Sequence, residues 1–263
     1  MLTPQPALYI PHGGGPCFFM DDPLGAWTGM AEFLRGVKQG LPRVPDAILV
    51  ISGHWETQGF TFTAAVQPDL IYDYYGFPAH TYEITYPVPG VPSLALEASE
   101  LLRNAGLDAR TDPARGLDHG VFIPLKVMFP DADVPIVEMS LDAELDPALH
   151  LAAGRALAPL RERNILLLGS GMSFHNMRGY RNPHFTEPSL RFDAWLTATM
   201  EAPLPERSAR LANWAQAPDA RLCHPREEHL LPAMVVAGAS PAAGRRVYAE
   251  TVLDTANSGF AFP

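Results

Sequence analysis

AILVISGHWE, residues 47–56, contains the features that decide the fold. Its first six residues, Ala47–Ser52, form an apolar run rich in β-branched side chains, which is typical of a strand buried in a sheet. The run ends at Gly53 and His54, so a polar side chain directly follows a buried strand. The same combination of apolar run, glycine and histidine returns in ALYIPHGGG at residues 7–15 and in ILLLGSGMSFH at residues 165–175. This repetition points to several strands that deliver histidines to one edge of a sheet.

Short apolar runs alternate with longer amphipathic stretches along the chain, which is the order expected of strand–helix units. Strands are predicted at Ala7–Ile10, Ala47–Ser52, Phe60–Ala65, Pro135–Leu141, Ile165–Gly169 and Arg246–Thr251. Helices are predicted at Leu24–Lys38, Pro92–Ala105, Val121–Met128, Pro147–Glu162, Ser189–Met200 and Pro225–Ala237. Since no repeat or linker-like segment interrupts this pattern, we expect a single α/β domain over residues 1–263. Its central mixed, mostly parallel sheet should carry helices on both faces.

Composition excludes several classes of partner. The net charge of −10, with 29 acidic against 19 basic residues, argues against nucleic acid, because phosphate binding needs a concentrated basic face. No segment approaches the ~18 consecutive apolar residues of a membrane-spanning helix. The N-terminus lacks a basic region followed by an apolar stretch, so no signal peptide is expected. These features together predict a cytoplasmic enzyme without a membrane partner.

The chain contains two cysteines, Cys17 and Cys223. Without a secretory signal, two reduced thiols are a better expectation than one disulfide. Each cysteine lies a few residues from a candidate site histidine, so both could line the same cavity. Ordinary packing in the core is the simpler interpretation of both.

Three histidines follow predicted strands and are the main candidates for a functional site. His12 lies just past the first strand, His54 just past the second, and His175 in the loop after Ile165–Gly169. In open α/β sheets, ligands bind outside the carboxyl ends of the strands, so these three side chains are well placed to converge. The triplet Gly13–Gly15 permits positive φ and close approach of a ligand to the backbone.

Two further histidines have more ambiguous surroundings. In CHPREEHLLP, residues 223–232, Pro225 is expected to begin a helix whose first turn holds Glu227 and Glu228 near the positive end of the helix dipole. His229 would then lie near the start of this helix and point into the site. His119 stands beside Asp118 in GLDHG, which fits a surface turn and a site residue equally well.

The remaining histidines carry less information. His224 is expected to cap a helix or to support a ligand from behind, and His80, His150 and His184 are expected to be structural or exposed. Neutral imidazoles suit both iron(II) and zinc(II), and the histidines alone do not choose between these metals. Open coordination positions would suit oxygen activation, whereas a closed shell of four ligands would suit structural zinc.

At these residues the chain resembles the class III extradiol ring-cleavage dioxygenases, in particular their DOPA 4,5-dioxygenase-like branch, which is related to the large subunit of protocatechuate 4,5-dioxygenase. The resemblance rests on ALYIPHGGGP, AILVISGHWE, YDYYGFPAHTYEITYPVPG, GLDHGVFIPLKVMFPDADVPIVEMSL, LLLGSGMSFHNMR and HPREEHLLPAMVVAGA. It extends from residue 7 to about residue 238. It implies a metal-dependent α/β fold with a central mixed sheet.

The resemblance also assigns roles to individual residues. It implies that His12, His54 and His229 bind the metal, although the protocatechuate branch has a glutamate at the third position and Glu228 lies next to His229. It implies an acid/base role for His175, which joins the metal shell as a fourth ligand in some zinc-bound relatives, and a catalytic and substrate contact for His119. The aromatic segment from residue 72 to residue 86 resembles a substrate-side loop, with Tyr72 and Tyr74 as candidate contacts. Ordinary packing of these aromatic residues is an equally good interpretation.

The activity expected from the resemblance is iron(II)-dependent extradiol cleavage, in which both atoms of O2 enter a DOPA-like or related catechol. Iron(II) is expected in the active enzyme, and zinc(II) can occupy the same site in purified protein. A zinc-dependent hydrolase, with Glu227 or Glu228 as general base, is the alternative. A metal-binding protein without catalytic activity is a weaker alternative. The particular catechol, the cleavage position and the oligomeric state are left open.

Overall fold

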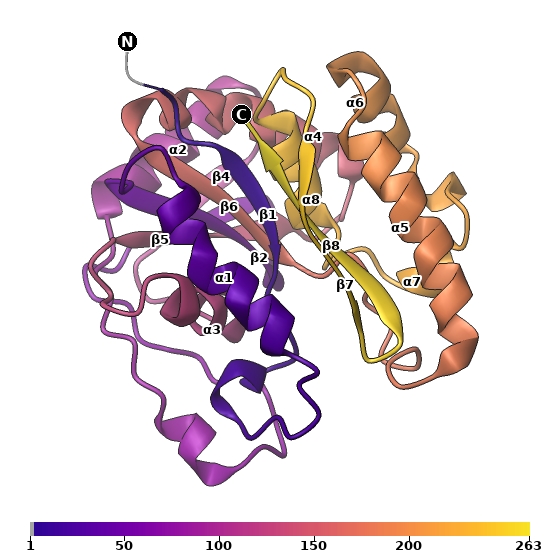
Figure 1. Ribbon diagram of the computed structural model, residues 1–263. Coiled ribbons are helices and arrows are strands. Elements are labelled where there is room, and N and C mark those ends of the chain that lie inside the picture. The colour runs from indigo at the N-terminus through magenta and orange to yellow at the C-terminus, as the bar shows by residue number, and fades with distance from the viewer. Residues whose placement is uncertain (1–2) are drawn as a thin grey trace.

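A computed structural model describes residues 3–263, which surround one eight-stranded sheet with the order β4-β3-β5-β2-β6-β1-β8-β7 (Figure 1). The strands are β1 (Ala7–Pro11), β2 (Ala47–Thr57), β3 (Phe60–Thr63), β4 (Ala109–Asp112), β5 (Ile136–Asp142), β6 (Ile165–Gly171), β7 (Arg245–Val252) and β8 (Thr255–Phe262). In the centre of the sheet, β5, β2, β6 and β1 run parallel to one another. The pairs β3–β5, β1–β8 and β7–β8 are antiparallel, so the predicted mixed, mostly parallel sheet is confirmed.

The helices lie on both faces of this sheet, as predicted. They are α1 (Thr28–Gly40), α2 (Pro92–Asn104), α3 (His119–Met128), α4 (Pro147–Leu157), α5 (Thr186–Met200), α6 (Leu204–Ala212), α7 (Ala220–Cys223) and α8 (Leu231–Gly238). Short 3-10 turns lie at Cys17–Phe19, Ala79–Glu83, Ala158–Arg163, Pro183–Phe185 and Trp214–Gln216. The core on one face contains residues of α1 and α3, and the core on the other contains residues of α2, α4, α5, α6 and α8.

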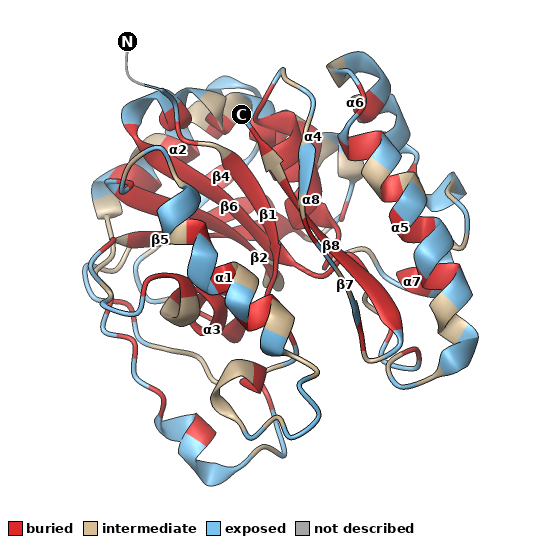
Figure 2. Cartoon of the chain, in the orientation of Figure 1, coloured by how far each residue is buried: buried red, intermediate tan, exposed pale blue. Residues whose placement is uncertain are grey.

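Alternation along the central strands separates the two cores. In β2, Ile48 and Val50 belong to the core under α1 and α3, whereas Leu49 and Ile51 belong to the opposite core. Because both faces are covered, all four side chains are fully buried and the strand is apolar without a break. Figure 2 shows the consequence, with the central strands almost uniformly buried and helices such as α1 and α5 striped by exposed residues.

Two strands were not predicted, β4 and β8. Strand β8 has the sequence TANSGFAF, in which Thr255 is the one β-branched residue and most of the others are small or polar, so its strand signal is weak. It pairs with β1 on one side and with β7 on the other. These pairings supply hydrogen bonds and burial that cannot be predicted from the local sequence. Gly259 allows β8 and β1 to pack closely, because a Cβ at this position would make a tight contact of 3.0 Å with the backbone oxygen of Tyr9.

Several helix boundaries differ from the predictions, and α6 and α7 were not predicted. The helix expected from Leu24 begins at Thr28, and the one expected over Pro147–Glu162 changes to a 3-10 turn at Ala158, next to Pro159. The largest error concerns Pro225–Ala237. There the helix α8 begins only at Leu231, and the six residues from Pro225 onward form turns instead.

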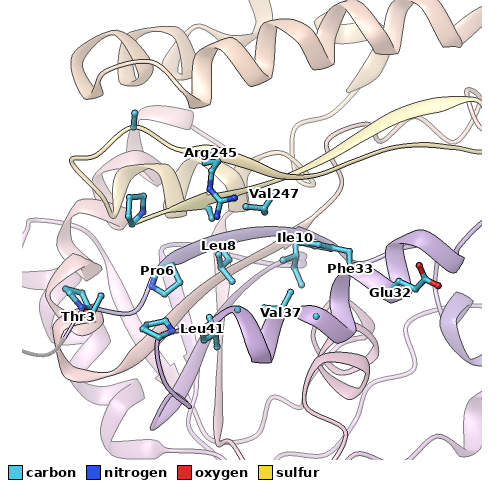
Figure 3. A pocket seen from close by; sticks show the side chains of 17 residues that line it. Thr3, Pro6, Leu8, Ile10, Glu32, Phe33, Val37, Leu41, Arg245 and Val247 are labelled. Carbon is cyan, nitrogen blue, oxygen red and sulfur yellow. The ribbon is translucent and has the colours of Figure 1, made fainter.

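A groove of about 960 Å³ lies between α1 and the β7–β8 hairpin (Figure 3). We call it the α1 groove. Its lining is mostly apolar, with Leu8 and Ile10 from β1 and Val37 from α1, and it includes the charged residues Glu32 and Arg245. Within residues 3–263, no histidine lines this groove. In the same part of the chain, no helix combines the length and apolar character needed to cross a membrane.

Candidate metal centre

Five histidines meet at the carboxyl ends of β1, β2 and β6, which are adjacent in the centre of the sheet. His12 follows β1 directly, and His175 lies four residues beyond the end of β6. His54 was expected just past its strand but lies inside β2, which continues to Thr57 after a register irregularity between Ile51 and Glu56. Such an irregularity re-aims side chains, and here it lies at the position of the histidine. His119 and His229 join the group from other elements, and we call these five residues the histidine cluster.

Three members of the cluster, His12, His54 and His229, surround a common point. The distances between their ring centroids are 5.0 Å for His12–His54, 5.2 Å for His12–His229 and 4.8 Å for His54–His229. One nitrogen from each ring can be chosen so that all three lie within 4.8 Å of one another. The predicted convergence of these side chains is therefore present.

The nitrogen positions fit a bound transition-metal ion. The Nε2 atoms of His54 and His229 are 3.2 Å apart. Two nitrogens that each bind one ion at ~2.0–2.1 Å lie roughly 3.0–3.4 Å from each other, depending on the angle at the ion. His12 is buried, and among residues 3–263 neither of its ring nitrogens has a hydrogen-bonding partner. A buried polar atom of this kind requires a partner, and a metal ion would provide one.

Burial keeps the three imidazoles in the form that binds metals. Burial, reinforced by the neighbouring histidines, lowers the pKa of His12 and of His229 well below the usual value. Burial and the nearby His119 lower the pKa of His54 to about 4. All three rings are therefore neutral near pH 7 and offer a lone pair, as iron(II) and zinc(II) require.

His229 and its neighbour Glu228 come from the turns that precede α8, which corrects the helix predicted to begin at Pro225. The backbone oxygen of His229 accepts hydrogen bonds from the Tyr9 hydroxyl at 2.8 Å and from the Met172 backbone N–H at 3.2 Å. These bonds hold the chain around His229 against β1 and the end of β6. Gly171 permits this approach, because a Cβ there would collide with the same backbone oxygen.

Glu228 does not lie in the first turn of a helix, which corrects the prediction that it interacts with the positive end of a helix dipole. Its Oε1 lies 3.1 Å from Nδ1 of His175 and 2.9 Å from Nδ1 of His229. Burial alone would raise the pKa of Glu228, but the hydrogen bonds from His175 and His229 lower it well below the usual range. The carboxylate therefore carries its charge beside the two imidazoles. Glu227 instead pairs with Arg221 at 2.5 Å.

His119 is the buried first residue of α3, so the interpretation as a surface turn is wrong. Its ring lies 4.0 Å from that of His54 and 5.6 Å from that of His12, measured between centroids. Asp73 Oδ1 accepts from His119 twice, from Nδ1 at 2.8 Å and from the backbone N–H at 2.9 Å. The other oxygen of Asp73 lies 3.6 Å from Nδ1 of His54.

A buried acidic pair lies behind His54. Ser52 accepts from the backbone N–H of His54 at 3.1 Å and donates to Asp118 at 2.8 Å. Asp118 in turn contacts Arg115 at 3.2 Å, and its backbone N–H donates to Oε2 of Glu138 at 3.2 Å. Burial and the proximity of Asp118 raise the pKa of Glu138 well above its usual value.

The other candidates lie outside the cluster or at its border. His224 is buried with Nε2 at 2.9 Å from the Ser173 carbonyl, and His150 is buried and structural, with Nε2 accepting from the Asp142 backbone N–H at 3.3 Å. His80 and His184 are exposed, as expected. Both cysteines are free thiols, and Cys17 is buried directly beneath Gly13.

The two candidate tyrosines use their hydroxyls within their own loop. The hydroxyl of Tyr72 donates to the Ile84 carbonyl, and that of Tyr74 to the Thr81 carbonyl, both at 2.6 Å. The ring of Tyr74 lies edge-on to His119, with 5.7 Å between centroids. Tyr74 therefore borders the cluster with its ring and not with its hydroxyl.

Asp73, Glu228 and Glu138 are the residues of this site that the sequence analysis missed or misread. Asp73 lies between the two candidate tyrosines, and Glu228 lies beside a candidate ligand, so proximity in sequence was the available signal for both. Glu138 lies in the middle of a predicted apolar strand. Because a buried carboxylate is costly unless it has partners, its position in such a strand was the available signal.

The chain is similar to known aromatic ring-opening dioxygenases. A family described as the catalytic LigB subunit of aromatic ring-opening dioxygenases matches residues 7–260. The dioxygenase tasH of Hapsidospora irregularis is 40% identical over 257 residues, which cover 89% of this chain and 78% of that protein. The 4,5-DOPA dioxygenase extradiol of Beta vulgaris is 35% identical over 95% of this chain and 91% of its own length.

Two proteins of Escherichia coli K12 are also similar to this chain. The 4,5-DOPA dioxygenase extradiol of Escherichia coli K12 is 36% identical over 90% of this chain and 86% of its own length. The crystal structure of an uncharacterized protein from Escherichia coli K12 superposes with a TM-score of 0.78 at 28% identity, covering 98% of this chain and all of that one (100%).

Proposed function

Because this chain belongs to the LigB family of aromatic ring-opening dioxygenases, we propose that it opens a catechol-type ring with dioxygen and uses iron(II) bound by His12, His54 and His229. The observation that carries the proposal is the set of three neutral imidazoles around one point, with His12 and His229 buried, His54 half-buried, and Nε2 of His54 and His229 3.2 Å apart. Three protein ligands leave coordination positions for other groups, as oxygen activation requires.

Iron(II) held by neutral ligands would supply full cationic charge to favour an ionised catechol and a position at which dioxygen can react. Residues of the chain would transfer the protons. A catechol must lose hydroxyl protons when it binds, and a base near the metal must receive one of them. His175, stacked on His229 at 3.4 Å between centroids, is the nearest candidate and would return the proton as the ring opens.

His119 is proposed to contact the substrate. It adjoins both His12 and His54, and its Nδ1 hydrogen bond to Asp73 leaves Nε2 available to a bound ring substituent. Tyr74, beside His119, would offer an aromatic edge to the substrate, with Tyr72 supporting it at 6.2 Å between ring centroids. His54 and His175 retain exposed side-chain fractions of 20% and 23%, so solvent and substrate can reach this side of the cluster.

A DOPA-like catechol is the first substrate to test, because several relatives carry the name 4,5-DOPA dioxygenase extradiol. The experiment is anaerobic reconstitution with iron(II), followed by measurement of oxygen uptake and visible absorbance with DOPA, protocatechuate and unsubstituted catechol. The expected result is stoichiometric oxygen uptake together with a yellow ring-opened product. Iron-loaded protein that consumes no oxygen with any catechol would refute the proposal.

The alternative of a zinc hydrolase has less support, because both of its candidate general bases already have partners. Oε1 of Glu228 accepts from two imidazoles, and Glu227 is paired with Arg221. Binding of zinc to purified protein would not support hydrolysis, because histidine sites accept several divalent metals.

A further inference from the structure

A single carboxylate oxygen connects two members of the histidine cluster. Oε1 of Glu228 lies 2.9 Å from Nδ1 of His229 and 3.1 Å from Nδ1 of His175. The two rings are stacked, with 3.4 Å between centroids and 19° between planes. A metal-ligating histidine commonly donates its second N–H to a carboxylate, but here the same oxygen also serves a neighbouring histidine.

This geometry determines which nitrogen of each ring carries the proton. An ionised carboxylate only accepts hydrogen bonds, so each Nδ1 that contacts Oε1 must donate an N–H. A neutral imidazole with hydrogen on Nδ1 has its lone pair on Nε2. In this tautomer the Nε2 lone pair of His229 faces Nε2 of His54 at 3.2 Å, and the nearly parallel ring of His175 has its own Nε2 lone pair left to accept a proton.

The carboxylate lies beside a cation. Its side chain is only 14% exposed, and Oε2, which makes no hydrogen bond within residues 3–263, lies 3.6 Å from Arg226. Arg226 also forms a two-pronged ion pair with Glu56 at 2.5 and 2.6 Å. Because Glu56 belongs to β2, the strand that contributes His54, this chain of contacts ties the turn around His229 to the other half of the site.

We propose that Glu228 is a positioning residue that fixes the Nδ1–H tautomer of both His229 and His175, so that one Nε2 can bind the metal while the other can accept a substrate proton. The inference rests on the proposed function for the role of His175. It also excludes Glu228 as a metal ligand through this oxygen. The carboxylate lies at Nδ1 of His229, on the side of the ring opposite to the Nε2 that faces His54.

The first test is spectroscopic and uses metal-free protein. Long-range ¹H–¹⁵N spectra of the imidazoles should show hydrogen on Nδ1 in both His229 and His175 of the parent. In Glu228→Gln the neutral amide is a weaker acceptor, and an Nε2–H population should appear for both. If either histidine of the parent carries hydrogen on Nε2, the inference is wrong, whatever the variant shows.

The second test measures metal binding and turnover, with Glu227→Gln as the matched control. Glu227 undergoes the same change one residue away, but its partner is the exposed Arg221. The iron(II) affinity of Glu228→Gln, measured by competition with a chelator, should be ~10–100-fold lower than that of the parent. Its kcat should fall by a larger factor than its KM changes. Glu227→Gln should match the parent in both. Equal behaviour of the two variants would overturn the inference.

A double-variant cycle separates the positioning role from simple structural damage. In a His175→Phe background, Glu228→Gln should still weaken iron(II) binding but should cause no further loss of kcat, because the proton acceptor is already absent. A full, additive loss of kcat would mean that Glu228 acts independently of His175 and would refute the shared role. Inactivity of the parent towards all catechols, with both tautomers as expected, would refute the proposed function and leave the positioning of the two rings established.

Discussion

The histidine cluster and the α1 groove are built on the same strand, yet they differ in every property that matters for chemistry. Strand β1 contributes Leu8 and Ile10 to the groove and, one residue past its end, His12 to the cluster. The groove collects apolar side chains from the face of the sheet and has a volume of about 960 Å³. The cluster brings imidazoles and carboxylates together, and the pKa values of His12 and Glu228 lie well below their usual values there.

The volume of a cavity therefore does not mark the proposed reactive site of this molecule. Residues 12, 54 and 175 are far apart in the sequence, and the parallel order of β2, β6 and β1 brings them together, while His119 joins from α3 and His229 from the turns before α8. Groove residues come from surfaces that any α/β packing creates. Substitutions in the cluster should therefore change metal binding and turnover, whereas substitutions in the groove should change stability.

The largest effect is expected for His12→Ala. This removes a ligand whose two ring nitrogens have no partner within residues 3–263, and iron(II) affinity should fall by more than the ~10–100-fold typical of residues behind the ligands. Metal content after anaerobic reconstitution measures the effect. His80→Ala, at an exposed histidine, is the control and should load iron normally. Full iron content and activity in His12→Ala would remove the central assignment.

His175→Phe should have the next largest effect. The aromatic ring preserves the stacking on His229, so iron should stay largely bound, while the loss of the proton acceptor slows turnover by ~10²–10⁴-fold. Iron content and kcat, determined on the same preparation, separate the two consequences. Turnover at the parent rate would show that His175 transfers no proton in the reaction.

Asp73→Asn should have a smaller effect than either. The amide keeps the shape of the side chain but removes the charge that receives the Nδ1–H of His119 at 2.8 Å. We expect kcat to fall by ~10–100-fold, the usual cost of losing such a supporting carboxylate. Iron affinity should change less than in Glu228→Gln. Asp73 lies 3.6 Å from Nδ1 of the proposed metal ligand His54, which is beyond hydrogen-bonding distance. A larger loss of iron in Asp73→Asn than in Glu228→Gln would reverse this ranking of the two carboxylates.

Much of the site could be predicted from the sequence, because the rule that links strand ends to ligands depends only on topology. His12, His54 and His175 were found in this way, and unbroken apolar runs revealed the strands that carry them. His229 was identified within a wrongly predicted helix. The backbone around it is held by hydrogen bonds from Tyr9 and Met172. Local sequence preferences cannot predict contacts between residues so far apart in the chain.

The carboxylates were harder to predict for a related reason. The partners Asp73 and His119 are 46 positions apart, and Glu228 and His175 are 53 apart, so their pairing exists only after folding. Strand β8 presents the same difficulty at the level of the fold. Most of its residues are small or polar and have weak strand preference, and pairing with both β1 and β7 stabilises it as a strand.

The smallest effect, and one of opposite sign, is expected for Gly36→Ala in the α1 groove. Gly36 is inside helix α1, and a Cβ built there meets no atom of residues 3–263 within 4 Å. Alanine should therefore raise the free energy of unfolding by ~0.5–1 kcal/mol through helix preference alone, and leave turnover unchanged. Gly154→Ala in α4 is the matched control and should destabilise the protein, because its Cβ would collide with the Val235 backbone oxygen. Chemical denaturation of both variants tests the pair. A loss of activity in Gly36→Ala would break the separation between groove and cluster, since it would mean that the open space beside α1 is used in the reaction.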